Sequence, residues 1–82
     1  MKILYLLKDA VPNDLLPLDQ SLDREVSILL LQDGVKLAHV SADRVYALSD
    51  DVRARNITSS YPVVSYADML RMMFEADTVI AL

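Results

Sequence analysis

The chain has 82 residues, a length that suits one domain and leaves no room for a second hydrophobic core. Eight lysines and arginines against twelve aspartates and glutamates give a net charge of -4, which disfavours direct binding to a nucleic-acid backbone. Cysteine is absent, which excludes disulfides, thiolate zinc sites and a thiol nucleophile in this chain. His39 is the only histidine, so a multi-histidine metal site within one subunit is excluded as well.

We expect a soluble, cytoplasmic protein with apolar surface left for a partner. Hydrophobic residues make up 54% of the chain, above the roughly 45–50% of ordinary soluble domains. A chain this short buries only about 60–65% of its unfolded surface. No apolar run approaches the ~20 residues that span a bilayer, and the first ten residues lack the small-residue cleavage pattern of a signal peptide. We therefore expect no membrane contact.

Four segments are apolar on both faces of any strand drawn through them, and a fifth is weaker because it contains Pro62 near its start. Continuous apolar runs are typical of parallel strands that helices cover on both sides. The five predicted strands are KILYLL (2–7), VSILLL (26–31), RVYAL (44–48), YPVVSY (61–66) and TVIAL (78–82).

Helix signals lie between these strands. The segment NDLLPLDQSL (13–22) has leucines on one face, and Pro17 must occupy its first turn if it is helical. The residues after Gly34 predict a turn or two of helix, with Val35, Ala38 and also His39 facing inward.

The segment SDDVRARN (49–56) predicts a short, mostly solvated helix. Ser49 is a candidate N-cap, and Asp50 and Asp51 suit the positive amino-terminal end of a helix, as the two arginines suit the other end. Asn56 can adopt the left-handed conformation that closes a helix.

The segment SYADMLRMMFEA (65–76) gives the clearest helix signal. Ser65 and Asp68 have the spacing of a capping box. Apolar residues recur at i, i+3, i+4, i+7 and i+8, which predicts a face that packs on the sheet. This predicted face consists of Tyr66, Met69, Leu70, Met73 and Phe74.

Alternation of strands and helices predicts an α/β protein: a single domain over 1–82, folded as a three-layer α/β/α sandwich with a mainly parallel sheet of about five strands. In such sheets the functional crevice lies outside the carboxyl ends of the strands. The candidate ligand or partner rim at these ends is Asp9, Gln32, Asp33 and Gly34. We expect Gly34 to take a positive φ there. The alternative is that Asp33 caps the following turn and the glycine only permits it.

Other candidate residues have simpler explanations. Asp33 and three further aspartates could bind a cation or act as a general base, but caps and turns account for each of them. His39 could act with Asp33 as a base, although packing is the commoner role of a lone histidine. We therefore predict no catalytic residue, metal or cofactor. The candidate interface residues are Met72, whose thioether adapts to different partners, Tyr46 and Leu82.

Three segments resemble, in order and spacing, the DsrH/TusB family of sulfur-relay proteins within the DsrE-like superfamily. They are LLLQDGV (29–35), VYALSDDVRARN (45–56) and VVSYADMLRM (63–72). The resemblance implies a DsrE-like fold and an auxiliary, non-catalytic subunit. Its complex would hand persulfide sulfur onward, toward 2-thiouridine of tRNA in some organisms and within sulfur oxidation in others. The implied partners are homologous subunits that carry cysteine.

The sequence departs from the family at three places. Asn56 stands where relatives commonly have glycine, and Leu82 stands where many have tryptophan. Some relatives carry a cysteine in the loop after the first strand, but KDAVPND (8–14) contains none. Persulfide chemistry needs a thiolate, so sulfur transfer would have to use a cysteine of the partner. We therefore expect a homo- or hetero-oligomer that is not itself an enzyme.

A second hypothesis for the function is also consistent with the sequence. In it the chain is a stand-alone homo-oligomer of the same fold with a small-ligand or regulatory role, and the rim of Asp9, Gln32, Asp33 and Gly34 forms its pocket.

Overall fold

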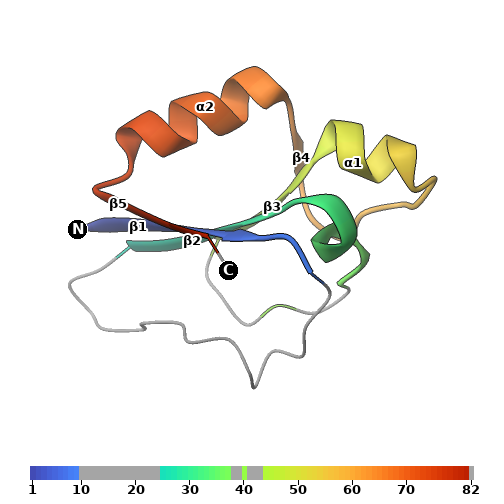
Figure 1. Cartoon of the computed structure of the whole chain (residues 1–82), viewed down its shortest axis with the longest axis horizontal. Helices are drawn as coiled ribbons and strands as arrows, with labels where there is room; N and C mark the ends of the chain where they lie inside the picture. Colours follow the sequence, from blue (N-terminus) through green and yellow to red (C-terminus); the bar gives the residue numbers. More distant parts are fainter. Residues whose placement is uncertain (10–24, 38–39, 41–43, 82) are drawn as a thin grey trace.

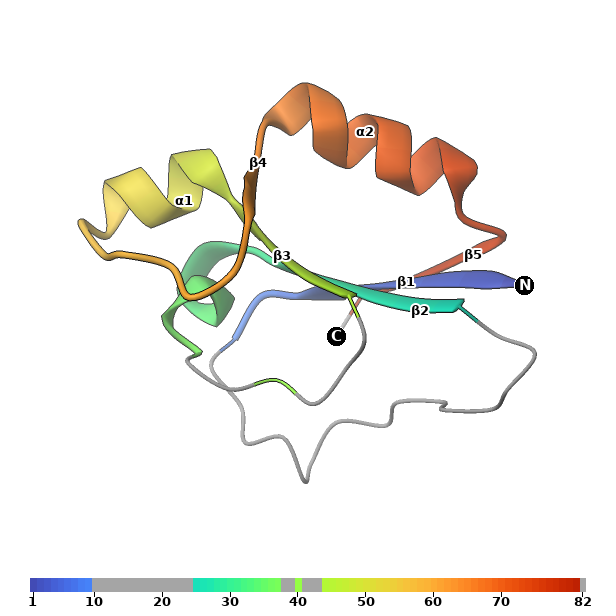
Figure 2. The same ribbon diagram turned by 180° about the vertical axis from the view of Figure 1, so that it is seen from behind.

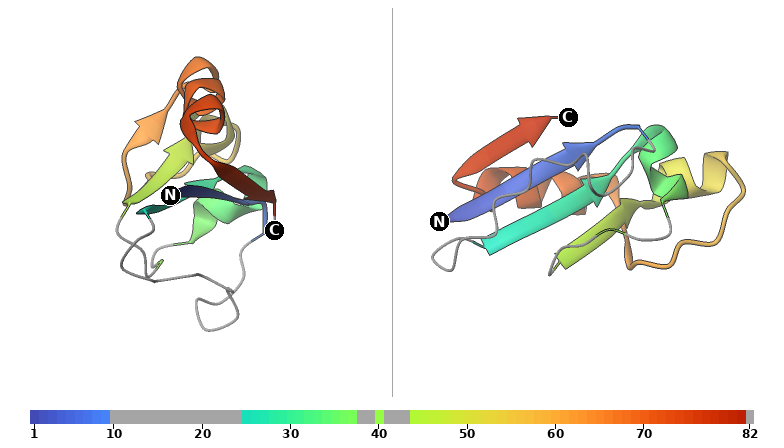
Figure 3. Two further views of the ribbon diagram at one scale, coloured as in Figure 1. Left: turned by 90° about the vertical axis from the view of Figure 1, so that its left-hand side faces the viewer. Right: turned by 90° about the horizontal axis from the view of Figure 1, so that it is seen from below.

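The computed structural model of the chain describes residues 1–9, 25–37, 40 and 44–81. Its strands are β1 (Lys2–Leu7), β2 (Glu25–Leu30), β3 (Arg44–Leu48), β4 (Val63–Val64) and β5 (Thr78–Ala81). They form one sheet in the order β4-β3-β2-β1-β5, and all neighbouring pairs are parallel. The arrows of β1, β2, β3 and β5 point the same way in Figure 3. The predicted α/β class with a parallel sheet of five strands is confirmed.

Two α-helices and one 3-10 helix accompany the sheet: η2 (Gln32–Lys36), α1 (Ser49–Ala54) and α2 (Tyr66–Glu75). Helix α2 lies across one face of the sheet, and α1 lies beside η2 at the other end of the molecule (Figures 1 and 2). Within the described residues, the sheet and α2 therefore form two layers. The helix predicted at 13–22, and the inward positions Ala38 and His39, lie outside these residues.

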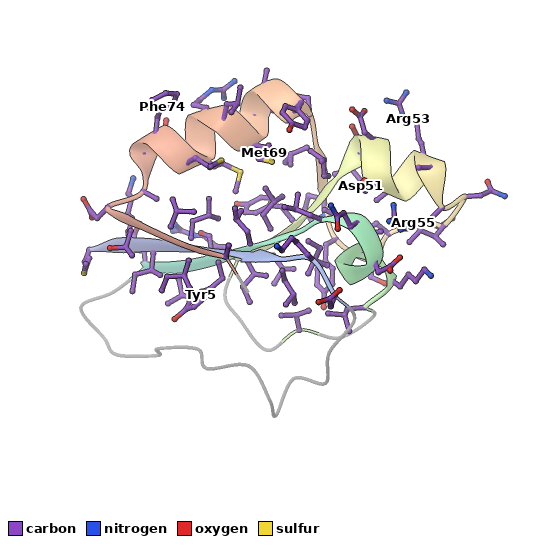
Figure 4. The ribbon with its side chains drawn as sticks, in the orientation of Figure 1. Tyr5, Asp51, Arg53, Arg55, Met69 and Phe74 are labelled. Atoms are coloured by element: carbon purple, nitrogen blue, oxygen red, sulfur yellow. The ribbon has the colours of Figure 1, made fainter. Side chains whose placement is uncertain are left out.

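The core has two parts, one on each face of the sheet, because the strands are apolar on both faces. On the face toward α2, Leu4, Leu29 and Leu48 pack with Met69. The larger part lies on the opposite face, toward which Tyr5 points in Figure 4, and Val35 of η2 contributes to it. The remaining members of this larger cluster are Ile3, Leu7, Val26, Ile28, Leu30, Val40, Val45, Ala47 and Val52.

Strand β4 has two residues, whereas the prediction spanned 61–66. Pro62 has no N–H to give to a ladder, although its carbonyl accepts the Ala47 N–H at 3.0 Å. The Tyr61 hydroxyl accepts the Val40 N–H at 2.7 Å, on the side of the larger core. Ser65 already caps α2, so pairing is confined to the two valines between these constraints.

The predicted N-cap of α1 is wrong. Strand β3 runs directly into the helix, so Leu48 takes the cap position without a side-chain bond and Ser49 is the first helical residue. At the other end, the prediction for Asn56 is confirmed, since its φ is 51°. Asparagine tolerates this left-handed conformation better than most residues.

The capping box of α2 is confirmed. The Ser65 hydroxyl accepts the Asp68 backbone N–H at 3.1 Å, and the Asp68 carboxylate accepts the Ser65 N–H at 3.3 Å. These two bonds satisfy amide groups that the first helical turn leaves without partners.

The predicted apolar face of α2 is right for two of its five residues. Met69 is buried and Met73 is partly buried against the sheet, but Tyr66, Leu70 and Phe74 are exposed. The helix instead uses a neighbouring stripe with the same helical spacing. Its members are Met69, Met72, Met73 and Ala76. Both stripes fit the sequence pattern, and the unbranched methionines fill the space above the sheet.

The prediction of a positive φ at Gly34 is wrong, because Gln32 takes that conformation with φ 50°. Glycine is needed for a different reason. A Cβ on Gly34 would overlap the carbonyl oxygen of Leu7 and lie 3.1 Å from its carbonyl carbon. The turn after β2 therefore passes so close to the end of β1 that no side chain fits between them.

We expect Gly34→Ala to lower the free energy of unfolding by about 2 kcal/mol or more, because the added methyl group forces the two backbones apart. Urea denaturation of both proteins measures the difference. Lys36→Ala, at an exposed position of the same η2 helix, is the control and should change stability by no more than about 0.5 kcal/mol. Equal unfolding midpoints for Gly34→Ala and the unchanged protein would contradict the close approach.

Candidate functional site

The predicted rim at the carboxyl ends of the strands is assembled in part. The Leu31 N–H donates to the Leu7 carbonyl at 2.9 Å, and the Gly34 N–H donates to the Lys8 carbonyl at 3.1 Å. These bonds hold η2 against the end of β1, where Asp9 follows. However, within the described residues no hydrogen bond or ion pair joins Asp9 to the other three rim residues, Gln32, Asp33 and Gly34.

Arg55, directly after α1, contacts two acidic side chains at this end of the molecule. Its Nε donates to Asp33 Oδ1 at 3.0 Å, and its Nη1 lies 3.4 Å from Asp51 Oδ1. Figure 4 shows Asp51 and Arg55 on the side of α1 that faces η2. Asp51 Oδ2 also accepts the Gln32 N–H at 2.8 Å. We call Asp33, Asp51 and Arg55 the clasp, since they tie η2 to α1.

The side chains of the clasp form ion pairs with one another and are poorly suited to proton transfer. The hydrogen bond from Arg55, and then the positive charge of Lys36 at 3.6 Å, hold the pKa of Asp33 below its usual 3.8. A general base works best with a pKa near the operating pH, so this carboxylate is poorly suited to that role. Nor does Asp33 cap η2, whose N-cap is Leu31 without a side-chain bond. No local sequence pattern predicts this role of Arg55, because its contact with Asp33 spans 22 positions.

The candidate interface residues are less accessible than expected. Tyr46 and Met72 are partly buried, and both pack against the core on the α2 side of the sheet. Leu82 lies outside the described residues. His39, the other candidate base, lies outside them as well.

A pocket of about 340 Å³ lies between α2 and the amino ends of the central strands, at the opposite end of the sheet from the predicted rim. Tyr46 and Met72 contribute to its lining, together with Ser27 of β2. Pairs of opposite charge line it: Arg44 lies 3.3 Å from Glu25, and Arg71 lies 2.9 Å from Asp68. Hydrogen bonds from Ser65, first from its backbone N–H and then involving its side chain, lower the pKa of Asp68.

Helix α2 also presents an apolar stripe to solvent. Tyr66, Leu70 and Phe74 are 57%, 46% and 88% exposed, and their i, i+4, i+8 spacing places them in one line on the helix. Phe74 points away from the sheet in Figure 4, whereas Met69 points toward it. We call these three residues the outer stripe.

The described residues contain no group of three or more His, Cys, Asp or Glu side chains that could hold a metal ion. Of the helices in the described part of the chain, none combines the length and the apolar character that a membrane crossing requires. Neither a protein-family model nor a curated protein sequence matches the chain.

The clasp makes part of the stability dependent on pH. Asp33 has a lowered pKa in the folded state, so its ion pairing stabilises the protein above the unfolded-state pKa of 3.8 and is lost as the pH falls through the folded-state value. We expect Arg55→Ala to raise the pKa of Asp33 toward 3.8. Titration of the carboxyl carbon by NMR measures this change.

Arg53→Ala is the matched control for this titration, since Arg53 pairs with Asp50 at 2.7 Å and not with Asp33. It should leave the titration of Asp33 unchanged. An Asp33 pKa that is the same with and without Arg55 would refute the assignment of the shift to the clasp.

Proposed function

We propose that this protein is a thiol-free auxiliary subunit of a sulfur-relay complex, acting in the cytoplasm. It binds homologous subunits that carry cysteine and supports their sulfur transfer without carrying sulfur itself. The observation that carries this proposal is the outer stripe of α2, an apolar surface on a helix whose other face is already packed. The likeness of three segments to the DsrH/TusB family supplies the identity of the complex.

The chemistry of persulfide transfer explains why the role is auxiliary. An acceptor thiolate attacks the outer sulfur of a donor persulfide, the donor S–S bond breaks, and the donor leaves as a thiolate. Each carrier in such a relay needs a sulfhydryl group, and none of these 82 residues provides one. The chain can then contribute only through contact, by holding cysteine-bearing subunits in their working arrangement.

The outer stripe has the properties of a contact surface. Large apolar side chains gain roughly 1.5–3 kcal/mol each on full burial, so Phe74 and Leu70 would contribute strongly to an interface. Aromatic residues are enriched at the centres of interfaces, and charged residues form their rims. The capping box holds the first turn of α2, so the stripe is presented on an ordered helix.

The partners would also carry out any contact with RNA. A net charge of -4 gives this chain no general attraction for phosphate. In a relay toward 2-thiouridine, the tRNA would therefore bind to another subunit.

We expect Phe74→Ser to weaken the complex by at least about tenfold, since serine removes most of the apolar area at the centre of the contact. The measurement is sedimentation velocity of the purified chain mixed with cysteine-bearing homologues from the same organism. Val63→Ser replaces another exposed apolar residue, away from α2 on strand β4, and should leave the complex intact.

Two results would contradict the proposal. One is a complex whose stability does not respond to Phe74→Ser. The other is a tight homo-oligomer that ignores the added homologues, which would favour a stand-alone module that binds a small ligand.

A further inference from the structure

We propose that the pocket beneath α2 binds a zwitterionic amino acid with an apolar side chain. This site is separate from the outer stripe, which lies on the other face of the same helix. Binding at this site does not require the protein to belong to a sulfur relay.

Residues of β1, β2 and β3 on the α2 side of the sheet form the floor of the pocket. Leu4 and Ser27 are directly paired across β1 and β2, and Tyr46 lies on the same face of the neighbouring strand β3. Ser27 is small and stands among larger residues, so it leaves room between the sheet and the helix. Met72 and Ala76 of α2 line the helix side. These surfaces suit the apolar body of a ligand.

The volume sets the size of the ligand. A pocket of about 340 Å³ is near the lower end of the range for small-molecule sites. A free amino acid with a large apolar side chain, such as phenylalanine, suits a pocket of this size.

The charges around the pocket select a zwitterion. Three cationic and three anionic side chains line it, so a purely anionic or purely cationic ligand gains no net attraction. Two of the pairs are already satisfied internally, Arg44 with Glu25 and Arg71 with Asp68. Among the described residues, the side chains of Lys2 and Glu75 have no ion-pair partner.

The backbone holds Lys2 near the end of α2, so the side chains of Lys2 and Glu75 border the same end of the pocket. The Lys2 N–H donates to Asp77 Oδ2 at 2.7 Å, and the Asp77 N–H donates to the Lys2 carbonyl at 2.8 Å. Glu75 is the last residue of α2, two positions before Asp77. Lys2 can therefore receive the carboxylate of an amino acid, and Glu75 its ammonium group. The Ser27 hydroxyl, which makes no hydrogen bond within the described part of the chain, can add a polar contact.

Titration calorimetry of the full chain with three probes tests this assignment. The probes are L-phenylalanine, 3-phenylpropionate, which lacks the ammonium group, and phenethylamine, which lacks the carboxylate. We expect phenylalanine to bind at least about tenfold more tightly than either analogue, because each lost ion pair removes a charge-assisted hydrogen bond.

Two exposed variants assign the charges separately. Glu75→Gln should weaken the binding of phenylalanine and phenethylamine but not that of phenylpropionate, and Lys2→Gln should weaken phenylalanine and phenylpropionate but not phenethylamine. Both residues are exposed, so neither change threatens the fold. Ser27→Leu should fill the pocket and abolish binding, while Phe74→Ser, on the outer stripe, should leave it unchanged.

Three results would overturn the inference: no binding of phenylalanine at millimolar concentration, equal affinity for all three probes, or affinities that do not respond to Glu75→Gln and Lys2→Gln. None of these results bears on whether cysteine-bearing subunits dock on the outer stripe, so the two proposals fail independently.

Discussion

The structure depends on one backbone contact, the approach of Gly34 to the end of β1. Because no Cβ separates them, the Gly34 N–H reaches the Lys8 carbonyl and η2 lies directly on the sheet. This placement brings Asp33 within 3.0 Å of Arg55, which also pairs with Asp51. The carboxyl end of the sheet, where parallel α/β proteins usually bind ligands, is in this protein tied together by its own ion pairs.

Within the described residues, α2 borders two surfaces that are open to a ligand or a partner. One side of this helix leaves a charged-rimmed pocket above Ser27, and the other presents Leu70 and Phe74 to solvent. The orientation of α2 explains both surfaces. Because the stripe that contains Met69 and Met72 packs against the sheet, the aromatic residues of the helix face solvent. A small domain with this much apolar surface is suited to working in contact with another molecule.

Much of the fold can be predicted from local patterns. Continuous apolar runs indicate parallel strands, the spacing of Ser65 and Asp68 indicates a capping box, and the tolerance of asparagine accounts for Asn56. The site is harder, because it depends on alignment between distant segments. No local sequence signal shows which of the two apolar stripes of α2 packs against the sheet. Nor does the sequence show that Gly34 is required because a Cβ would overlap β1, and not because it takes a positive φ. The pocket requires the register that brings Leu4 beside Ser27, and this register is a property of the assembled sheet.

Site-specific photo-cross-linking tests most directly whether the protein works through the outer surface of α2. A photoreactive amino acid replaces Phe74 in one sample and Lys36, on the carboxyl-end helix η2, in the other, and each is irradiated in the presence of the cysteine-bearing homologues. Cross-links to those homologues from position 74, and none from position 36, are the result that this account predicts. Cross-links from position 36 alone would place the contact at the carboxyl ends of the strands and contradict it.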